Sequence, residues 1–293
     1  MKKLIETIKN IWKIEDLKTR IINTLLLLVV YRVGTFVVLP GIDPNKLSEL
    51  ASQASQGVLG LVNIFAGGAF SRASIFALGI MPYISASIVI QLLSIAVPTF
   101  QKMQKDGEEG RRKINQITRI LTIAITAVQG IGYLINLQSQ SPGAIDSYSA
   151  WWIFSSIVVL SGGTLFTMWL GEKITDKGLG NGISLIIMVG IISRLPFGLY
   201  EELTGRLGGA GGLVFFLLEV AVWLAVIGAV VALVQGTRKI PVSYAKRIVG
   251  NRMYQGGRNY LPLKVNSAGV MPIIFAQALM FIPSSIASFF PDS

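Results

Sequence analysis

The nine residues GIMPYISAS at positions 79–87 are echoed 190 residues later by GVMPIIFAQ at positions 269–277. Glycine, methionine, proline, isoleucine and alanine occupy the same places in both copies. Each copy lies in a long apolar run, so the echo relates two segments of the same kind. It predicts a chain built from two related halves, and the composition around it indicates what those halves are.

The composition points to a membrane. The chain of 293 residues is 52% apolar and only 14% charged, with a mean hydropathy of +0.61. Soluble domains carry about 25% charged residues, so this low charge content indicates burial in a bilayer. The sequence contains no cysteine and no histidine, which excludes disulfides, thiol nucleophiles, Ser-His triads and imidazole-based zinc or haem sites. We therefore expect no enzyme, no catalytic residue, no metal and no cofactor.

Seven apolar stretches approach or exceed the roughly 20 residues that a spanning helix needs. They are residues 21–39, 75–97, 118–137, 151–170, 183–200, 212–234 and 266–290. The alternate connecting segments 1–20, 98–119, 172–182 and 235–266 hold 21 of the 26 Lys and Arg. The other connecting segments hold four, and Arg32 lies within the first span. By the positive-inside rule the N-terminus is cytoplasmic, and this topology accounts for the net charge of +11 without nucleic acid.

Several features indicate that the chain is more than seven uninterrupted spanning helices. The glycine-rich apolar run between Gly57 and Phe70 is too short to cross a bilayer. It is either an amphipathic helix at the interface or a re-entrant segment, which would require a cavity around it. Prolines at positions 82, 196, 272 and 283 should bend or break the second, fifth and seventh spans.

The echoed segments would cross the membrane in opposite directions, because they fall in the second and seventh spans. That relation is typical of inverted-topology repeats with a functional site near the midplane. If the second span matches the seventh, the repeated unit contains five spans. Seven spans leave the second unit three short, so we expect the sequence to be part of a longer chain. Channels and secondary transporters share this architecture. Transporters should show converging charges at mid-depth, and Arg32 and Glu219 are the few candidates within spans.

Two local patterns suggest roles without deciding them. Helical spacing places Ile80 and Ile84 on one face, and with Ile187 and Ile274 they could form an apolar constriction or simply face lipid and other helices. The GLGNG run at 178–182 follows a membrane helix rather than a strand, which argues against a nucleotide loop. It predicts a tight turn with positive φ at glycine and Asn181 as a helix cap.

The longest motifs carry a resemblance to a known family. Residues 65–92 read FAGGAFSRASIFALGIMPYISASIVIQL, and residues 168–184 read MWLGEKITDKGLGNGIS. The first resembles the plug and second span of the SecY family, and the second is similar to another signature of that family. Further similar segments are residues 107–113, 244–247 and 261–266. The resemblance extends from about residue 19 to the last residue.

The resemblance implies an all-α, polytopic membrane helix bundle of the ten-span, inverted-repeat (5+5) type. Seven spans would be present, together with a short re-entrant plug helix at about 58–74, and the last three spans of the family would be absent. The implied organisation is an amphipathic cytoplasmic segment at 1–20, an N-terminal half at 21–200 and a partial C-terminal half at 201–293. The last part includes the basic loop 235–266.

Site residues follow from the same resemblance. The implied plug residues are Asn63, Ile64, Phe65, Ala66, Gly67, Gly68, Ala69 and Phe70. The implied hydrophobic pore ring consists of Ile80, Ile84, Ile187, Ile274 and Leu279. The second, third and seventh spans would line a lateral gate. The residues implied to contact the ribosome or the SecA motor are Arg238, Lys239, Lys246, Arg247 and Arg252.

The function implied by the resemblance is that of a passive protein-conducting pore in the bacterial inner membrane. Secretory chains would cross it, and membrane proteins would leave sideways into lipid. The implied partners are SecE, SecG, the SecA ATPase, the ribosome with its rRNA, signal peptides and nascent chains. The alternative kept open is a secondary transporter with inverted repeats.

Overall fold

The computed structural model is mostly helical. It describes residues 12–47, 60, 63–141, 143–145, 147–207, 212–243, 247–249, 252–254, 258–266 and 276. The chain divides into two compact units, one made of Met1–Phe197 with Phe275–Ser293 and the other of Gly198–Ile274.

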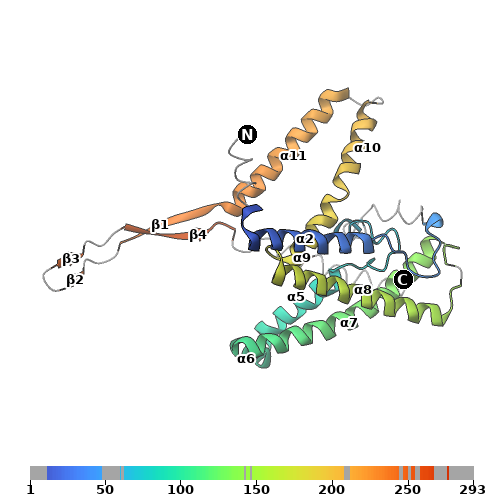
Figure 1. The fold of residues 1–293 in the computed structure, drawn as a ribbon, viewed down its shortest axis with the longest axis horizontal. Coiled ribbons are helices and arrows are strands. Elements are labelled where there is room, and N and C mark those ends of the chain that lie inside the picture. Colours follow the sequence, from blue (N-terminus) through green and yellow to red (C-terminus); the bar gives the residue numbers. More distant parts are fainter. Residues whose placement is uncertain are drawn as a thin grey trace. The chain divides into compact units, whose positions relative to one another are not determined.

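Among its described residues, the first unit has five main helices and two short elements, whose arrangement is drawn in Figure 1. The main helices are α2 (Glu15–Gly34), α5 (Met81–Ala96), α7 (Gly107–Gln140), α8 (Ala150–Lys177) and α9 (Gly182–Ile192). The short elements are the 3-10 turn η1 (Pro44–Lys46) and α6 (Pro98–Lys105). Helix α7 packs against α5 and α8, and α8 also packs against α2 and α9.

Proline sets the helix boundaries where the sequence predicted breaks. Helix α5 begins at Met81 rather than at residue 75, because Pro82 needs no backbone N–H bond in the first turn. The first six residues of the predicted second span 75–97 are therefore not helical. The predicted end of this span at residue 97 agrees with the end of α5, and there the chain turns by 101° into α6, a short helix that was not predicted and has Pro98 in its first turn. The predicted fifth span 183–200 is interrupted after Ile192, and α10 (Leu195–Leu207) carries Pro196 at its start.

Within the described residues, four helical segments are long and apolar enough to cross a membrane, or five if α5 and α6 count as one bent span. The four are α7, α8, α9 with α10, and α11 (Gly212–Gln235). Helix α2 covers most of the predicted first span but is not among them, because Lys18, Arg20 and Arg32 together make it too charged over the length that a span needs. The predicted seventh span 266–290 lies almost wholly outside the described residues.

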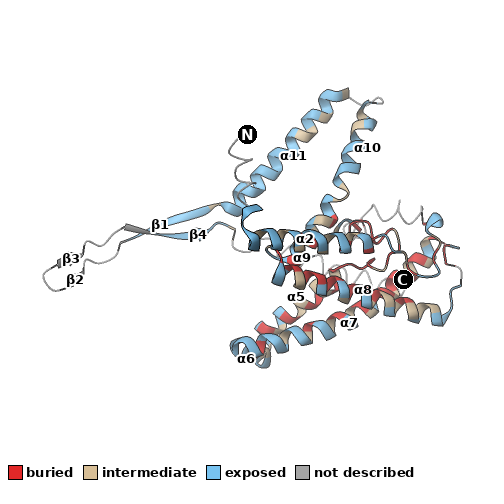
Figure 2. Ribbon diagram, in the orientation of Figure 1, coloured by how far each residue is buried: buried red, intermediate tan, exposed pale blue. Residues whose placement is uncertain are grey.

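Two hydrophobic clusters form the core of the first unit. One joins Leu39 and Ile42 to Phe70 and Leu78 and to α7 and α8 through Tyr133, Leu137 and Leu160. The other joins Tyr31 on α2, Ala69 and Phe76, Leu170 on α8 and Ile186 on α9. Residues 66–78 contribute to both clusters, so this connection lies in the interior rather than on the surface (Figure 2).

The second unit contains α10 from Gly198 onward, α11 and a β-ribbon. Helix α11 is apolar yet has no buried residue among those described (Figure 2). Arg206 on α10 pairs with Glu219 on α11 and with Glu202 one turn earlier, at 2.9 Å for the second pair. Glu219, one of the ionisable residues singled out within spans, therefore has its charge balanced by a neighbouring helix.

The basic loop 235–266 forms antiparallel strands, which an all-α prediction did not foresee. Strand β1 (Thr237–Ser243) pairs with β4 (Arg258–Lys264), with Thr237 opposite Lys264, and β2 (Arg247–Val249) pairs with β3 (Arg252–Tyr254). Pro241 and Pro262 lie inside β1 and β4. A two-stranded ribbon accepts them because every strand in it is an edge strand.

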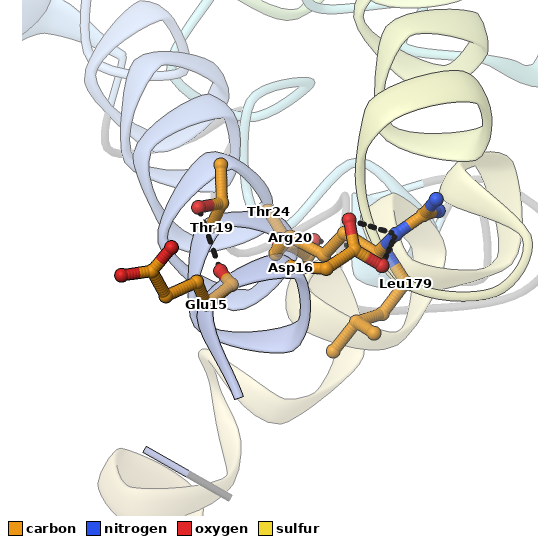
Figure 3. Close-up of polar contacts among 6 residues, drawn as sticks. All are labelled: Glu15, Asp16, Thr19, Arg20, Thr24 and Leu179. Atoms are coloured by element: carbon orange, nitrogen blue, oxygen red, sulfur yellow. Dashed lines mark hydrogen bonds and ion pairs between the residues drawn. The ribbon is translucent and has the colours of Figure 1, made fainter. Parts of the chain in front are cut away.

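The turn after α8 is held against α2 by Thr24 (Figure 3). The Thr24 hydroxyl donates to the Arg20 carbonyl at 2.7 Å and accepts the Leu179 N–H at 3.0 Å. Gly178 allows this approach, since a Cβ there would overlap Thr24 Oγ1. The predicted turn is confirmed: Gly180 has φ +63°, and Asn181 Oδ1 accepts the Ser184 N–H at 3.2 Å as the cap of α9.

Thr24→Val should lower the free energy of unfolding by about 1–3 kcal/mol, because it leaves the Leu179 N–H without its acceptor at constant side-chain size. Thr19 is the matched control: it also bonds back one turn, to the Glu15 carbonyl, but it is exposed (Figure 3). Thr19→Val should change the stability by about 0.5 kcal/mol or less. Thermal unfolding of both variants in detergent tests this, and equal effects would contradict the role given to Thr24.

Candidate functional site

The candidate site is the buried segment, which we define as residues 63–80. Its residues are helical only over 63–65 and continue to Ile80 as turns, apart from a β-bridge between Ser74 and Val38, and α5 begins at the next residue. The short plug helix expected at about 58–74 is therefore described as helix at residue 60 and over 63–65, whereas residues 66–74 are not helical. The helix cannot continue because Gly67 and Gly68 adopt φ +63° and +84°, values that favour glycine.

Polar contacts close the start of the buried segment into a compact loop. The Gly68 N–H donates to the Asn63 carbonyl at 2.8 Å, and the Ser71 N–H donates to Asn63 Oδ1 at 3.2 Å. Asn63 is buried, as are residues 66–71, whereas Ile64 is exposed and Phe65 is half-buried. A side-chain amide can be buried cheaply when backbone groups satisfy it, so Asn63 holds the loop together.

Tyr133 on α7 anchors the middle of the buried segment. Its hydroxyl donates to the Phe70 carbonyl at 2.9 Å, and its ring meets the Phe70 ring edge to face, with centroids 4.8 Å apart. Both side chains are almost fully buried, with 4% and 2% of their surfaces exposed. Since a carbonyl left unpaired in such surroundings is costly, this bond fixes the segment against α7.

The next residues pair with the chain that follows α2. The Leu39 N–H donates to the Ala73 carbonyl at 2.8 Å, and the Ile75 N–H donates to the Val37 carbonyl at 2.9 Å. Phe76 then stacks with Tyr31 on α2, with ring centroids 5.9 Å apart, and stacks at the same separation with Phe166 on α8. The buried segment is thereby attached to α2 and α8 as well as to α7.

Glycines on the surrounding helices allow the segment to approach their backbones. A Cβ on Gly163 of α8 would overlap the Ile75 carbonyl oxygen, and a Cβ on Gly190 of α9 would lie 2.5 Å from the Phe65 carbonyl oxygen. On Gly34 of α2 it would overlap the Phe76 ring. One glycine on each of three helices therefore forms a close contact with the segment.

Three arginines converge on the Gly67-Gly68 pair, and we call them the arginine cluster. Arg32 Nη1 donates to the Gly67 carbonyl at 3.0 Å, Arg72 Nη2 donates to the same oxygen at 3.4 Å, and Arg194 Nη2 donates to Ser71 Oγ at 3.4 Å. Arg72 lies outside the expected spans, and burial lowers its pKa, with the charges of Arg32 and Arg194 adding to the fall.

The expected ring residues are described only in part. Ile80 caps the start of α5 and is 3% exposed, and the Ile84 N–H donates to its carbonyl at 3.1 Å. Ile84 and Ile187, which lies within α9, are half-buried. Ile274 and Leu279 lie outside the described residues, so the ring stays a prediction.

The expected ribosome and motor contacts fall on the β-ribbon. Arg238 and Lys239 are exposed on β1, where adjacent side chains point to opposite faces. Arg247 lies on β2 and Arg252 on β3, whereas Lys246 lies outside the described residues. The predicted loop is thus an extended basic ribbon, and its contacts stay a prediction.

Apolar helices packed around a buried, turn-rich segment define a polytopic membrane protein with an internal plug-like element. The SecY family model matches residues 74–293, so the chain belongs to the SecY family. Nothing in these matches favours the secondary transporter. The chain is a multi-pass membrane protein.

Curated relatives and solved structures agree with this assignment. Protein translocase subunit SecY of Streptomyces galbus is 42% identical over 94% of this chain and 65% of its own length, and that of Escherichia coli K12 is 45% identical over 94% and 62%. The chain thus spans about two thirds of their length. A SecY structure described by its plug domain matches with TM-score 0.63 at 18% identity over 92% of this chain and 58% of its own. Canine Sec61 from a ribosome-channel complex matches with TM-score 0.55 at 18% identity, over 89% and 56%.

Sequence reasoning found the buried segment but missed what holds it. Tyr133 and the glycines Gly163 and Gly190 were not singled out, because contacts between distant segments leave no local pattern. The sequence did contain a signal for the arginine cluster, namely the positions of its members in the predicted topology. Arg32 lies inside a span, and Arg72 and Arg194 lie on the side predicted to be poor in cations.

Proposed function

We propose that this chain forms the central part of a protein-conducting pore, a passive conduit through which secretory proteins cross a membrane and from which membrane proteins leave sideways. The observation that supports this proposal is the buried segment, an apolar, turn-rich connection enclosed by α2, α7, α8 and α9. A connection on the surface would have no such role. A removable interior element is what a channel needs to stay sealed when no chain is passing.

We propose further that the segment acts as the plug and that Ile80, Ile84 and Ile187 belong to an apolar ring next to it, completed by Ile274 and Leu279. An apolar constriction opposes ions because they would lose their hydration there, while an unfolded polypeptide can slide past. Ile80 supports this arrangement, since it ends the buried segment and begins α5. The second, third and seventh spans would then line the lateral exit.

We propose that the protein lies in the bacterial inner membrane, as the resemblance to the SecY family implies, with a cytoplasmic N-terminus, which the charge distribution supports. The β-ribbon would then extend into the cytoplasm. Its exposed Arg238 and Lys239 are suited to rRNA phosphates or to an acidic motor surface. The proposed partners are the ribosome, the SecA motor, which would supply the energy, and the SecE and SecG subunits.

A photo-crosslinking amino acid at Ile84 or Ile187 should capture a stalled secretory chain in membranes that contain the assembled channel. Ile95 is the matched control, because it lies on the same helix as Ile84 and is 74% exposed. It should crosslink to lipid and not to the passing chain. The adducts can be resolved by gel electrophoresis with a labelled substrate. Lipid adducts alone at Ile84 and Ile187 would contradict the pore assignment.

A further inference from the structure

The predicted topology leaves five cations on the side away from the cytoplasm or within the first span. They are Arg32, Lys46, Arg72, Arg194 and Arg206. Lys46 lies 3.9 Å from Asp43, and Arg206 pairs with Glu202 and Glu219. The remaining three are the arginine cluster. So the three that have no carboxylate partner among the described residues lie together rather than dispersed.

The guanidinium groups of the cluster converge on one small volume. A Cβ placed on Gly68 would lie 2.7 Å from Arg72 Nη2 and 3.0 Å from Arg194 Nη2, and one on Gly67 would lie 3.2 Å from Arg32 Nη1. Two aromatic contacts confirm the crowding: the Arg32 and Arg72 guanidinium carbons lie 4.9 Å and 4.4 Å from the centre of the Phe36 ring. A glycine pair with positive φ is what leaves this space open.

The described neighbours do not neutralise this charge. The groups that the cluster bonds are neutral, namely the Gly67 carbonyl, the Ser71 hydroxyl and the face of Phe36. Arg72 Nη1 is buried and makes no hydrogen bond to a described residue. Like charges held close together in a half-buried site repel one another, and a buried donor without an acceptor adds a further cost. A bound negative charge would remove both.

We propose that Arg32, Arg72 and Arg194 bind one small, singly charged anion, either chloride from solution or a carboxylate. The cluster joins three elements: Arg32 lies on α2, Arg72 on the buried segment, and Arg194 just after α9. The anion therefore holds the buried segment against both helices. Without it, repulsion favours release of the segment. This site is independent of the proposed translocation, because it concerns attachment of the segment and not passage of a substrate.

Anion replacement at constant ionic strength tests the proposal. The melting temperature of the full chain in detergent is first measured in sodium methanesulfonate, whose anion is bulky. Sodium chloride or sodium formate then replaces part of that salt. A saturable rise in melting temperature of about 2–4 °C is expected with the fitting anion. A larger rise with chloride identifies a solution ion. A larger rise with formate identifies carboxylate chemistry.

Variants separate this site from general salt effects. Arg72→Gln and Arg194→Gln should each abolish the rise, whereas the control Arg206→Gln, which removes an already paired cation of the same side, should retain it. Because the chain has no cysteine, a single Ala69→Cys on the buried segment gives a second readout. Its labelling by a maleimide should slow by roughly fivefold when the anion is bound. No rise in the unmodified chain, or an equal rise in all three Arg variants, would overturn the proposal.

Discussion

Gly163→Ala on α8 is expected to be one of the most damaging single-methyl changes in the first unit. The added Cβ would overlap the Ile75 carbonyl oxygen and lie 3.1 Å from Cδ1 of Phe76. A backbone carbonyl cannot move aside as a long side chain can, and Ile75 is bonded to the chain after α2. Overpacking of this kind costs about 1–3 kcal/mol or more, which exceeds the helix propensity that alanine would add.

The adjacent Gly162 provides the control. A Cβ there meets nothing within 4 Å, so Gly162→Ala should keep only the gain in helix propensity, about 1 kcal/mol in the stabilising direction. The two variants thus differ in sign although they lie next to each other on one helix. Melting temperatures of both, with the labelling rate of Ala69→Cys, measure the effect. A Gly163→Ala variant as stable as Gly162→Ala would refute the close packing of α8 on the buried segment.

Much of the fold can be predicted from the sequence because helix formation and membrane insertion depend on local composition. Residues 118–137, 151–170 and 212–234 fall within α7, α8 and α11 for this reason. The prolines at 82 and 196 gave the correct positions for a helix start and a helix break. The β-ribbon was missed because its pairing joins β1 to β4 across some twenty residues, and no alternating apolar pattern marks a ribbon that covers no core.

The candidate site was predictable only as a segment. An apolar, glycine-rich run too short to cross left an interfacial helix and a re-entrant element open, and the burial of residues 66–71 favours the re-entrant element. Its anchor on α7 was not predictable, since Tyr133 lies 63 positions from Phe70 and belongs to no distinctive pattern. The positive-inside rule offers a general lesson: cations that violate it are few, and in this chain three of them meet at one point.

Tyr133→Ala is expected to release the buried segment from α7 and to destabilise the first unit more than Gly163→Ala does. It removes the edge-to-face contact with Phe70, leaves a cavity in the first hydrophobic cluster and deprives the Phe70 carbonyl of its donor. Replacing a buried aromatic residue with alanine costs about 3–5 kcal/mol. Tyr133→Phe keeps the ring and loses only the hydroxyl, so it should cost about 1–3 kcal/mol.

Comparing the two substitutions separates the contribution of the Tyr133 ring packing from that of its hydrogen bond. Tyr148→Ala is the control, since Tyr148 is 43% exposed and only tilts against Trp152; it should cost about 0.5 kcal/mol or less. Release of the segment, as distinct from general loosening, should accelerate maleimide labelling of Ala69→Cys before the helices melt. If Tyr133→Ala melts and labels like the unmodified chain, the segment is not anchored at α7. If instead Tyr133→Phe is as damaging as Tyr133→Ala, the hydrogen bond alone provides the anchor and the aromatic contact contributes nothing.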